Sequence, residues 1–173
     1  MSEPELDDEA ALARAVDPHH HSSCFGCGAD NPIGLHLPWD AVEPPGRPER
    51  YATGLSLDAR HQGGPGLAHG GIVSAALDEA MGILAQHVAF PSVTARMEVR
   101  YRRPVPTGRQ LRLEARVERV AGKQVTIAAR LRDGEGVLAE GRAVFLQVPL
   151  RHFLQTPEGL AQREEVRRRL KPS

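Results

Sequence analysis

The stretch from Gly66 to Val88 constrains the fold of this chain most strongly, because a glycine-rich loop runs there directly into a long apolar helix pattern. Apolar residues recur on one half of a helical wheel, namely Ile72, Val73, Ala76, Leu77, Ala80, Met81, Leu84 and Val88. The other half carries small residues and two adjacent carboxylates, namely Ser74, Ala75, Asp78, Glu79, Gly82, Ala85 and Gln86. With no lysine or arginine on either half, the helix is predicted to be enclosed by the rest of the fold.

The start of this helix has the composition of a site for a negatively charged oxygen. Its glycine-rich first turn leaves backbone N–H groups free, and the helix dipole adds partial positive charge to them. His69 precedes Gly70 and Gly71, and Asp78 follows nine residues after the histidine. A histidine, free N–H groups and a carboxylate on one helix suit the hydrolysis of an activated carbonyl.

Alternating apolar patterns predict strands before and after the helix. The predicted strands are 33–39, 51–57, 93–102, 111–120, 124–132 and 137–148, and the first two are followed by loops at 40–50 and 58–68. One face of the third strand is predicted to hold Val93, Ala95, Met97, Val99 and Tyr101, and one face of the fifth holds Val125, Ile127, Ala129 and Leu131. Period two in four consecutive runs predicts an antiparallel meander with one buried face, and hence an α+β fold.

The two ends of the chain differ in charge from the middle. Residues 1–22 begin with an acidic run and are predicted to form an N-terminal arm, whereas residues 149–173 form a basic tail with a helical pattern over 158–170. The domain itself is predicted to span residues 23–148.

Four blocks of sequence, in order, resemble the PaaI-like branch of the hotdog-fold acyl-CoA thioesterases. The hallmark is His69-Gly-Gly followed by Asp78, and the other blocks are residues 31–37, 61–66 and 101–108. The resemblance implies a hotdog fold, in which an antiparallel sheet of five or six strands wraps around a long central helix. It also implies that protomers pair into a homodimer, or a dimer of dimers, with shared active sites.

The same resemblance implies an enzyme that hydrolyses acyl-CoA thioesters to the free acid and coenzyme A. The backbone N–H of Gly70 would bind the thioester oxygen, and His69 would orient the loop. Asp78 would act as general base or nucleophile, and Thr94 would help to orient the water. Glu79 is the alternative candidate for the general base or nucleophile, although the nine-residue spacing from His69 favours Asp78.

Further residues are candidates for binding the substrate. His61 and Gln62, in the glycine-rich loop, are placed to bond a thioester carbonyl or to hold His69, or simply to satisfy the loop backbone. Coenzyme A carries phosphates, so basic residues near strand connections are candidates to bind them, although each also suits an exposed surface. These candidates are Arg102, Arg103 and Lys123, and the substrate-binding set also includes Gly71 and Glu79.

The sequence Cys24-Phe-Gly-Cys-Gly28 leaves three interpretations open. The first is a turn with buried thiols, which the resemblance favours. The second is a zinc site, which needs four ligands and would have to include two histidines of the run 19–21. The third is a redox pair, which would need a helix N-terminus that the pattern does not show. Neither a metal nor a cofactor is expected, since coenzyme A is part of the substrate.

The composition of the chain limits the kinds of partner that we expect the protein to bind. Formal net charge is zero and aromatic residues make up 4% of the chain, which argues against nucleic-acid binding. Neither a long apolar run nor a signal-peptide pattern is present, so we expect a cytoplasmic protein that does not bind membranes. The alternative functions are an acyl-thioester dehydratase or hydratase, and a non-catalytic acyl-CoA-binding or regulatory protein.

Overall fold

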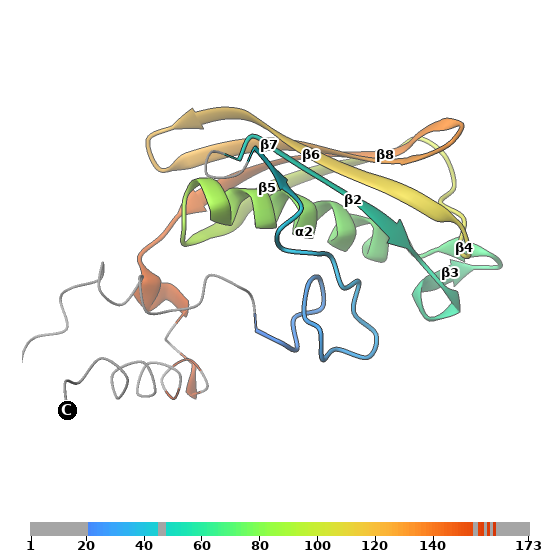
Figure 1. Cartoon of the computed structure of the whole chain (residues 1–173), viewed down its shortest axis with the longest axis horizontal. Helices are drawn as coiled ribbons and strands as arrows, with labels where there is room; N and C mark the ends of the chain where they lie inside the picture. Colours follow the sequence, from blue (N-terminus) through green and yellow to red (C-terminus); the bar gives the residue numbers. More distant parts are fainter. Residues whose placement is uncertain (1–20, 45–47, 154–155, 158, 160, 162–173) are drawn as a thin grey trace, which may run out of the picture. The chain divides into compact units, whose positions relative to one another are not determined.

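A computed structural model describes residues 21–44, 48–153, 156, 157, 159 and 161 (Figure 1). The sheet and the long helix lie in one compact unit, His19–Gln147. In the second unit, Leu150–Phe153 forms a short 3-10 helix, η2. Most of the predicted arm and tail lie outside the described residues. Among the described helices, none has both the length and the hydropathy needed to cross a membrane.

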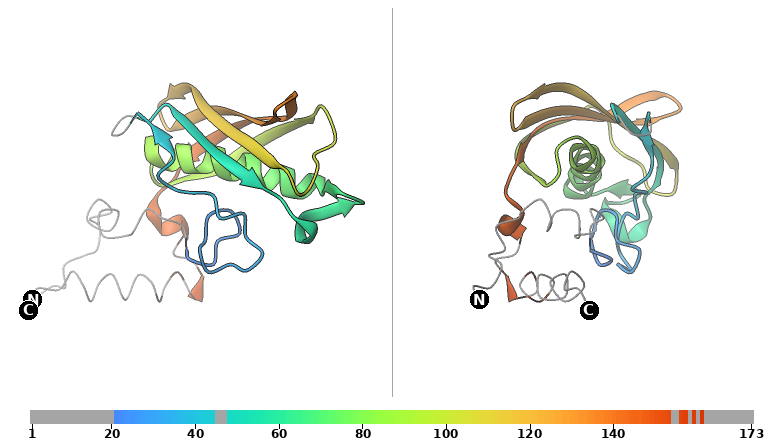
Figure 2. Two further views of the ribbon diagram at one scale, coloured as in Figure 1. Left: turned by 45° about the vertical axis from the view of Figure 1, so that its right-hand side comes forward. Right: turned by 60° about the vertical axis from the view of Figure 1, so that its left-hand side comes forward.

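The helix α2, Gly70–Val88, lies within the curve of the main sheet, as Figure 2 shows in its end-on view. Its buried residues are Val73, Ala76, Leu77, Ala80, Met81, Ile83, Leu84 and Ala85. The predicted apolar half is largely confirmed, but Ile72 and Val88 are only half-buried. Ala85, predicted on the other half, is buried because the curved sheet covers more than one side of the helix.

Six antiparallel strands form the sheet, in the spatial order β1-β2-β6-β7-β8-β5. They are β1 Val42–Glu43, β2 Arg50–Ser56, β5 Ser92–Tyr101, β6 Gln110–Ala121, β7 Gln124–Asp133 and β8 Gly136–Gln147. These strands confirm the α+β class. The meander is confirmed only for β6, β7 and β8. The strand after the helix, β5, pairs with β8 instead of β6, so the connection from β5 to β6 crosses the sheet.

The predicted alternation along β5 is confirmed for Met97 and Val99, which pack against the core, but it is broken at Ala95. The register with β8 shifts between Thr94 and Arg96, so Ala95 is an extra residue without a partner in the ladder. Ala95 is exposed, whereas Tyr101, although also exposed, has its hydroxyl against the start of α2. Along β7 the alternation is confirmed, since Val125, Ile127, Ala129 and Leu131 are all buried.

Residues 33–39 do not form the predicted first strand. The N–H groups of Leu35 and Leu37 donate to the carbonyls of Phe25 and Gly26. This segment therefore pairs with the loop of residues 24–28, the cysteine loop, instead of joining the sheet. His36 has a φ of 51°, which breaks the extended run between the two buried leucines. The loop containing these residues lies on the side of α2 away from the sheet (Figures 1 and 2).

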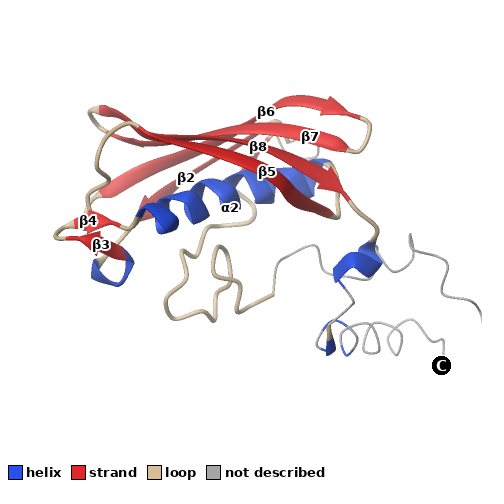
Figure 3. Cartoon of the chain, turned by 180° about the vertical axis from the view of Figure 1, so that it is seen from behind, coloured by secondary structure: helices blue, strands red, loops and turns tan. Residues whose placement is uncertain are grey.

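The predicted loop at 58–68 contains short regular elements. A 3-10 turn, η1 Ala59–His61, leads into the small hairpin of β3 Gln62–Gly64 and β4 Leu67–Ala68. Figure 3 shows this hairpin at the end of the sheet where α2 begins. The Ala68 N–H donates to the Val105 carbonyl, which ties the hairpin to the segment after β5.

Candidate active site

The first turn of α2 is fixed by His69. His69 is the N-cap of the helix, and its Nδ1 accepts a hydrogen bond from the Gly71 N–H at 2.9 Å. The His69 N–H donates to the His61 carbonyl at 2.8 Å. The Gly71 N–H is therefore used within the protein, and the histidine orients the helix start through its own backbone and ring.

Gly70 is held from its carbonyl side. The Tyr101 hydroxyl donates to the Gly70 carbonyl at 2.8 Å and lies 2.6 Å from the Ser74 Oγ. Within the described residues, the Gly70 N–H has no hydrogen-bond partner, and Gly70 is exposed. Sequence reasoning did not single out Ser74 and Tyr101 as site residues, because only the fold brings the end of β5 against the helix start.

Asp78 and Thr94 meet. The Thr94 hydroxyl donates to the Asp78 Oδ1 at 2.9 Å, from β5 to the middle of α2. Thr94 lies opposite Phe145 and Met97 lies opposite Ala143, and both partners on β8 are buried. The extra residue Ala95 thus lets Thr94 and Met97 face the helix together, although they are three residues apart.

Glu79 faces a different neighbour from Asp78. Its carboxylate lies beside Cys24 and Cys27, and ligand atoms of the three residues all fall within 4.8 Å of one another. Burial, together with the hydrogen bond to Glu79, raises the pKa of the Cys27 thiol. Both cysteines are reduced thiols and half-buried. Sequence reasoning expected any third ligand here to come from the histidine run, because the contact with Glu79 depends on the fold.

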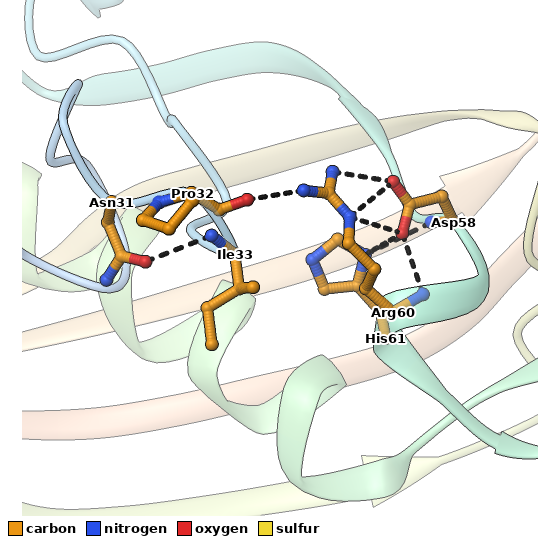
Figure 4. Close-up of polar contacts among 6 residues, drawn as sticks. All are labelled: Asn31, Pro32, Ile33, Asp58, Arg60 and His61. Atoms are coloured by element: carbon orange, nitrogen blue, oxygen red, sulfur yellow. Dashed lines mark hydrogen bonds and ion pairs between the residues drawn. The ribbon is translucent and has the colours of Figure 1, made fainter.

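His61 and Gln62 stabilise the loops that lead to the helix. His61 is 4% exposed, and its Nδ1 accepts from the Asp58 N–H at 3.1 Å. Figure 4 shows Arg60 bridging the Asp58 carboxylate and the Pro32 carbonyl, so the turn is joined to the N-terminal loop. The Arg60 guanidinium lowers the pKa of Asp58 to about 2.

The Gln62 side chain closes the β3–β4 hairpin, since its Oε1 accepts from the Gly66 N–H at 3.0 Å. Together, His61 and Gln62 make their described bonds within the loop, and His61 also holds His69. These contacts agree with the supporting roles that the sequence left open for both residues.

Two of the three predicted basic residues lie near the helix start. Arg102 and Arg103 line a shallow pocket together with Gly70 and Tyr101. Arg102 is paired with Glu140 at 2.8 Å, and Arg103 with Asp133 at 2.9 Å.

Lys123 does not join them within one chain. It lies in the β6–β7 turn, where its carbonyl accepts from the Gln147 N–H. Gln147 pairs with Ser92, at the opposite end of β5 from Tyr101.

The chain is similar to known proteins in sequence and in fold. Residues 65–140 match the sequence model of the thioesterase superfamily. Acyl-coenzyme A thioesterase THEM4 of Xenopus laevis is 28% identical over 89 residues, covering 50% of this chain and 40% of the relative. Acyl-coenzyme A thioesterase THEM5 of Mus musculus is 30% identical over 91 residues, covering 51% of this chain and 37% of the relative. The matched region is therefore less than half of each relative's length.

Solved structures share the fold. The thioesterase superfamily protein RHA08564 superposes with a TM-score of 0.58 and is 25% identical, covering 75% of this chain and 62% of that one. The PaaI protein from the phenylacetic acid degradation operon of E. coli superposes with a TM-score of 0.54 at 16% identity, covering 57% of this chain and 72% of that one. The second likeness concerns the fold alone.

Proposed function

We propose that this chain, which shares the fold of solved thioesterase-superfamily proteins and matches that superfamily's sequence model over residues 65–140, hydrolyses acyl-CoA thioesters. The observation that carries the proposal is the hydrogen bond from Thr94 to Asp78, on the same helix whose first turn leaves the Gly70 N–H without a partner among the described residues. A carboxylate and an N–H donor on one rigid helix are the two groups that thioester hydrolysis needs.

In the proposed reaction, the thioester oxygen accepts a hydrogen bond from the Gly70 N–H. The helix dipole stabilises the negative charge that develops on this oxygen as the carbonyl carbon becomes tetrahedral. Tyr101, bonded to the Gly70 carbonyl, keeps the peptide unit after this residue in place. Because these groups are already oriented, little reorganisation is needed during the reaction.

Asp78 takes the proton from the attacking water. The water oxygen bonds to the carbonyl carbon, and the tetrahedral intermediate then breaks its carbon–sulfur bond. The thiolate of coenzyme A leaves and takes up the proton that Asp78 removed, so the carboxylate is regenerated. Thr94 donates to Oδ1 of Asp78 and so orients the carboxylate that takes the proton.

We propose that the site is completed by a second copy of the chain. The residues around it are exposed in one copy, including Gly70 and Thr94. Strand β5 is the last strand of the sheet, so one of its edges has no partner among the described strands. A second β5, running antiparallel along this edge, would continue the sheet and exclude water from the site.

This arrangement also gives the basic residues a role. Arg102 and Arg103, beside Gly70, would bind phosphates of coenzyme A, exchanging part of their pairing with Glu140 and Asp133. Antiparallel pairing of the β5 edges would bring the Lys123 end of one copy toward the Gly70 end of the other. Lys123 would then contribute to the neighbouring site.

The test is the release of free thiol from a panel of short, medium, long and aromatic acyl-CoAs. The variant Asp78→Asn keeps the size of the side chain and its bond from Thr94, but it cannot take a proton. We expect kcat to fall at least about a hundredfold, as for the loss of a general base. The matched control is Glu114→Gln, a carboxylate paired with Arg112 on the outer face of the sheet.

Equal turnover by the Asp78→Asn variant and the parent would refute the role of Asp78. Tight binding of acyl-CoA without thiol release from any member of the panel would instead indicate a binding protein. The first conclusion requires a folded variant, shown by an unchanged circular dichroism spectrum.

A further inference from the structure

Cys24, Cys27 and Glu79 form a cluster that the proposed reaction does not use. Their ligand atoms all lie within 4.8 Å of one another, and the three residues are half-buried. Tetrahedral zinc with Zn–S bonds of about 2.3 Å places two sulfurs ~3.8 Å apart. The upper limit of 4.8 Å on the observed distances is about 1 Å longer than this, so the three ligand atoms would move closer together around an ion.

The backbone holds both thiols toward the helix. The Gly28 N–H donates to the Cys24 carbonyl at 3.0 Å, which closes the turn between the cysteines. The Leu37 N–H donates to the Gly26 carbonyl at 2.9 Å and fixes the turn to the rest of the loop. The positions of the two cysteines are therefore fixed by backbone hydrogen bonds within the loop and to residue 37. Exposed side chains that happen to lie near one another would lack this support.

Two glycines make the approach possible. A Cβ on Gly26 would overlap the carboxylate of Glu79, and a Cβ on Gly28 would overlap the backbone of Ser22 and Cys24. Glycine at position 26 therefore leaves room for the carboxylate where it lies in this structure. The spacing Cys-x-Gly-Cys-Gly is thus matched to the position of Glu79 on α2.

Tyr51 supplies a second, independent observation. Its side chain is fully buried, and its hydroxyl has no hydrogen-bond partner among the described residues. Burial raises the pKa of Tyr51, and the charges of Glu79, Cys27 and Asp40 add to this effect. A buried hydroxyl without a partner costs free energy, so a missing group beside the cluster would account for it.

We propose that Cys24, Cys27 and Glu79 bind one Zn²⁺ ion, with an oxygen from Tyr51, or from a water that Tyr51 holds, in the fourth position. Two thiolates and a carboxylate suit zinc and not magnesium or calcium, which prefer oxygen ligands alone. Binding releases the thiol protons to solvent, since the thiolate is the ligand.

The ion would act as a structural clamp. It would join the loop of residues 24–28 to α2 at Glu79, one position after Asp78. Glu79 would then be held away from the thioester, which leaves a single carboxylate for the reaction. This role is separate from catalysis and can be measured without any acyl-CoA.

The test is a Co²⁺ titration of the full chain, with His19, His20 and His21 replaced by alanine so that the histidine run cannot bind the metal. The reduced, metal-free protein should take up one Co²⁺ per chain. Thiolate-to-cobalt charge-transfer absorption and strong visible bands of tetrahedral Co²⁺ should appear, and equimolar Zn²⁺ should remove both.

Variants test whether the proposed ligands, and not other residues, bind the metal. Cys27→Ser should abolish most of the charge-transfer absorption. Glu79→Gln should keep the thiolate absorption but weaken Co²⁺ binding at least about tenfold. Glu114→Gln, on the outer face of the sheet, is the matched control and should bind like the parent.

Absence of the charge-transfer band, or its persistence in Cys27→Ser, would overturn the proposal. If the cysteine variants fail to fold, the parent protein still decides. Zn²⁺ must then raise its melting temperature and protect both thiols from alkylation, and failure of either effect rejects the site.

Discussion

At the scale of single residues, two neighbouring acids of α2 have different surroundings. Asp78 accepts from Thr94 of β5, whereas Glu79 lies beside Cys24 and Cys27 of the N-terminal loop. Successive residues of a helix point about 100° apart, so one helix can direct two adjacent carboxylates to two separate sites. This divergence gives a structural reason to prefer Asp78 for catalysis, and the assignment itself stays a prediction.

The bond between Thr94 and Asp78 can be tested by Thr94→Val, which removes the hydroxyl and preserves the shape. A hydrogen bond to a charged group contributes about 1.5–3 kcal/mol, so kcat should fall roughly ten- to hundredfold if the bond orients Asp78. KM should change little, because the hydroxyl would not contact the coenzyme A portion.

Steady-state kinetics over the acyl-CoA panel give this measurement. Thr126→Val, a threonine on β7 opposite Val144, serves as control. Unchanged kcat in Thr94→Val would mean that Asp78 does not need this partner.

At the scale of the helix, its start depends on one cap. The His69 Nδ1 accepts from the Gly71 N–H and so satisfies a donor that has no partner within the helix. The position is fixed in turn by the bond from the His69 N–H to His61. The cap and the Gly70 N–H, which has no partner among the described residues, belong to the same turn, so stability and the proposed chemistry are linked there.

His69→Ala should lower the free energy of unfolding by about 0.5–2 kcal/mol, the usual cost of losing an N-cap. His69→Asn keeps an acceptor at the cap and should recover most of that loss. Urea unfolding followed by circular dichroism measures both variants.

Activity adds a second comparison for His69. If the histidine only orients the helix start, the asparagine variant should keep kcat within a few-fold of the parent. An asparagine variant as unstable as the alanine variant would contradict the capping role.

At the scale of the whole molecule, the sheet ends in β5 and leaves one of its edges without a described partner. The outer face of the sheet differs from this edge, because it carries ion pairs such as Arg130 with Glu140 and Arg142 with Glu118. An open edge beside the candidate site favours pairing there, through backbone hydrogen bonds that add a further strand.

Ala95→Arg tests this pairing. Ala95 is exposed and has no partner in β8, so the longer side chain leaves the sheet of one copy intact. We expect the parent to sediment as a dimer or dimer of dimers and the variant as a monomer. Activity should fall at least about a hundredfold, since a site built from two copies loses its geometry.

Analytical ultracentrifugation gives the oligomeric state, and Thr126→Arg on β7 is the control. A parent that is monomeric and active would refute the shared site.

The sequence alone determined the elements whose signal is local. Apolar periodicity predicted α2 and the strands β2, β5, β6, β7 and β8 to within one or two residues at each end, because a buried face imposes its period on the sequence. It also placed His69 and Gly70 at the helix start and Asp78 on the same helix. These relations follow from spacing along a single element.

The tertiary structure decided what depends on distant partners. Residues 33–39 pair with the cysteine loop and so do not join the sheet. Strand β5 lies beside β8, not beside the next strand in sequence, β6. The extra residue Ala95 turned Thr94 toward Asp78, and closure of the loop brought Cys27 to Glu79. No local pattern encodes such contacts, because their free energy comes from packing between elements that are far apart in the chain.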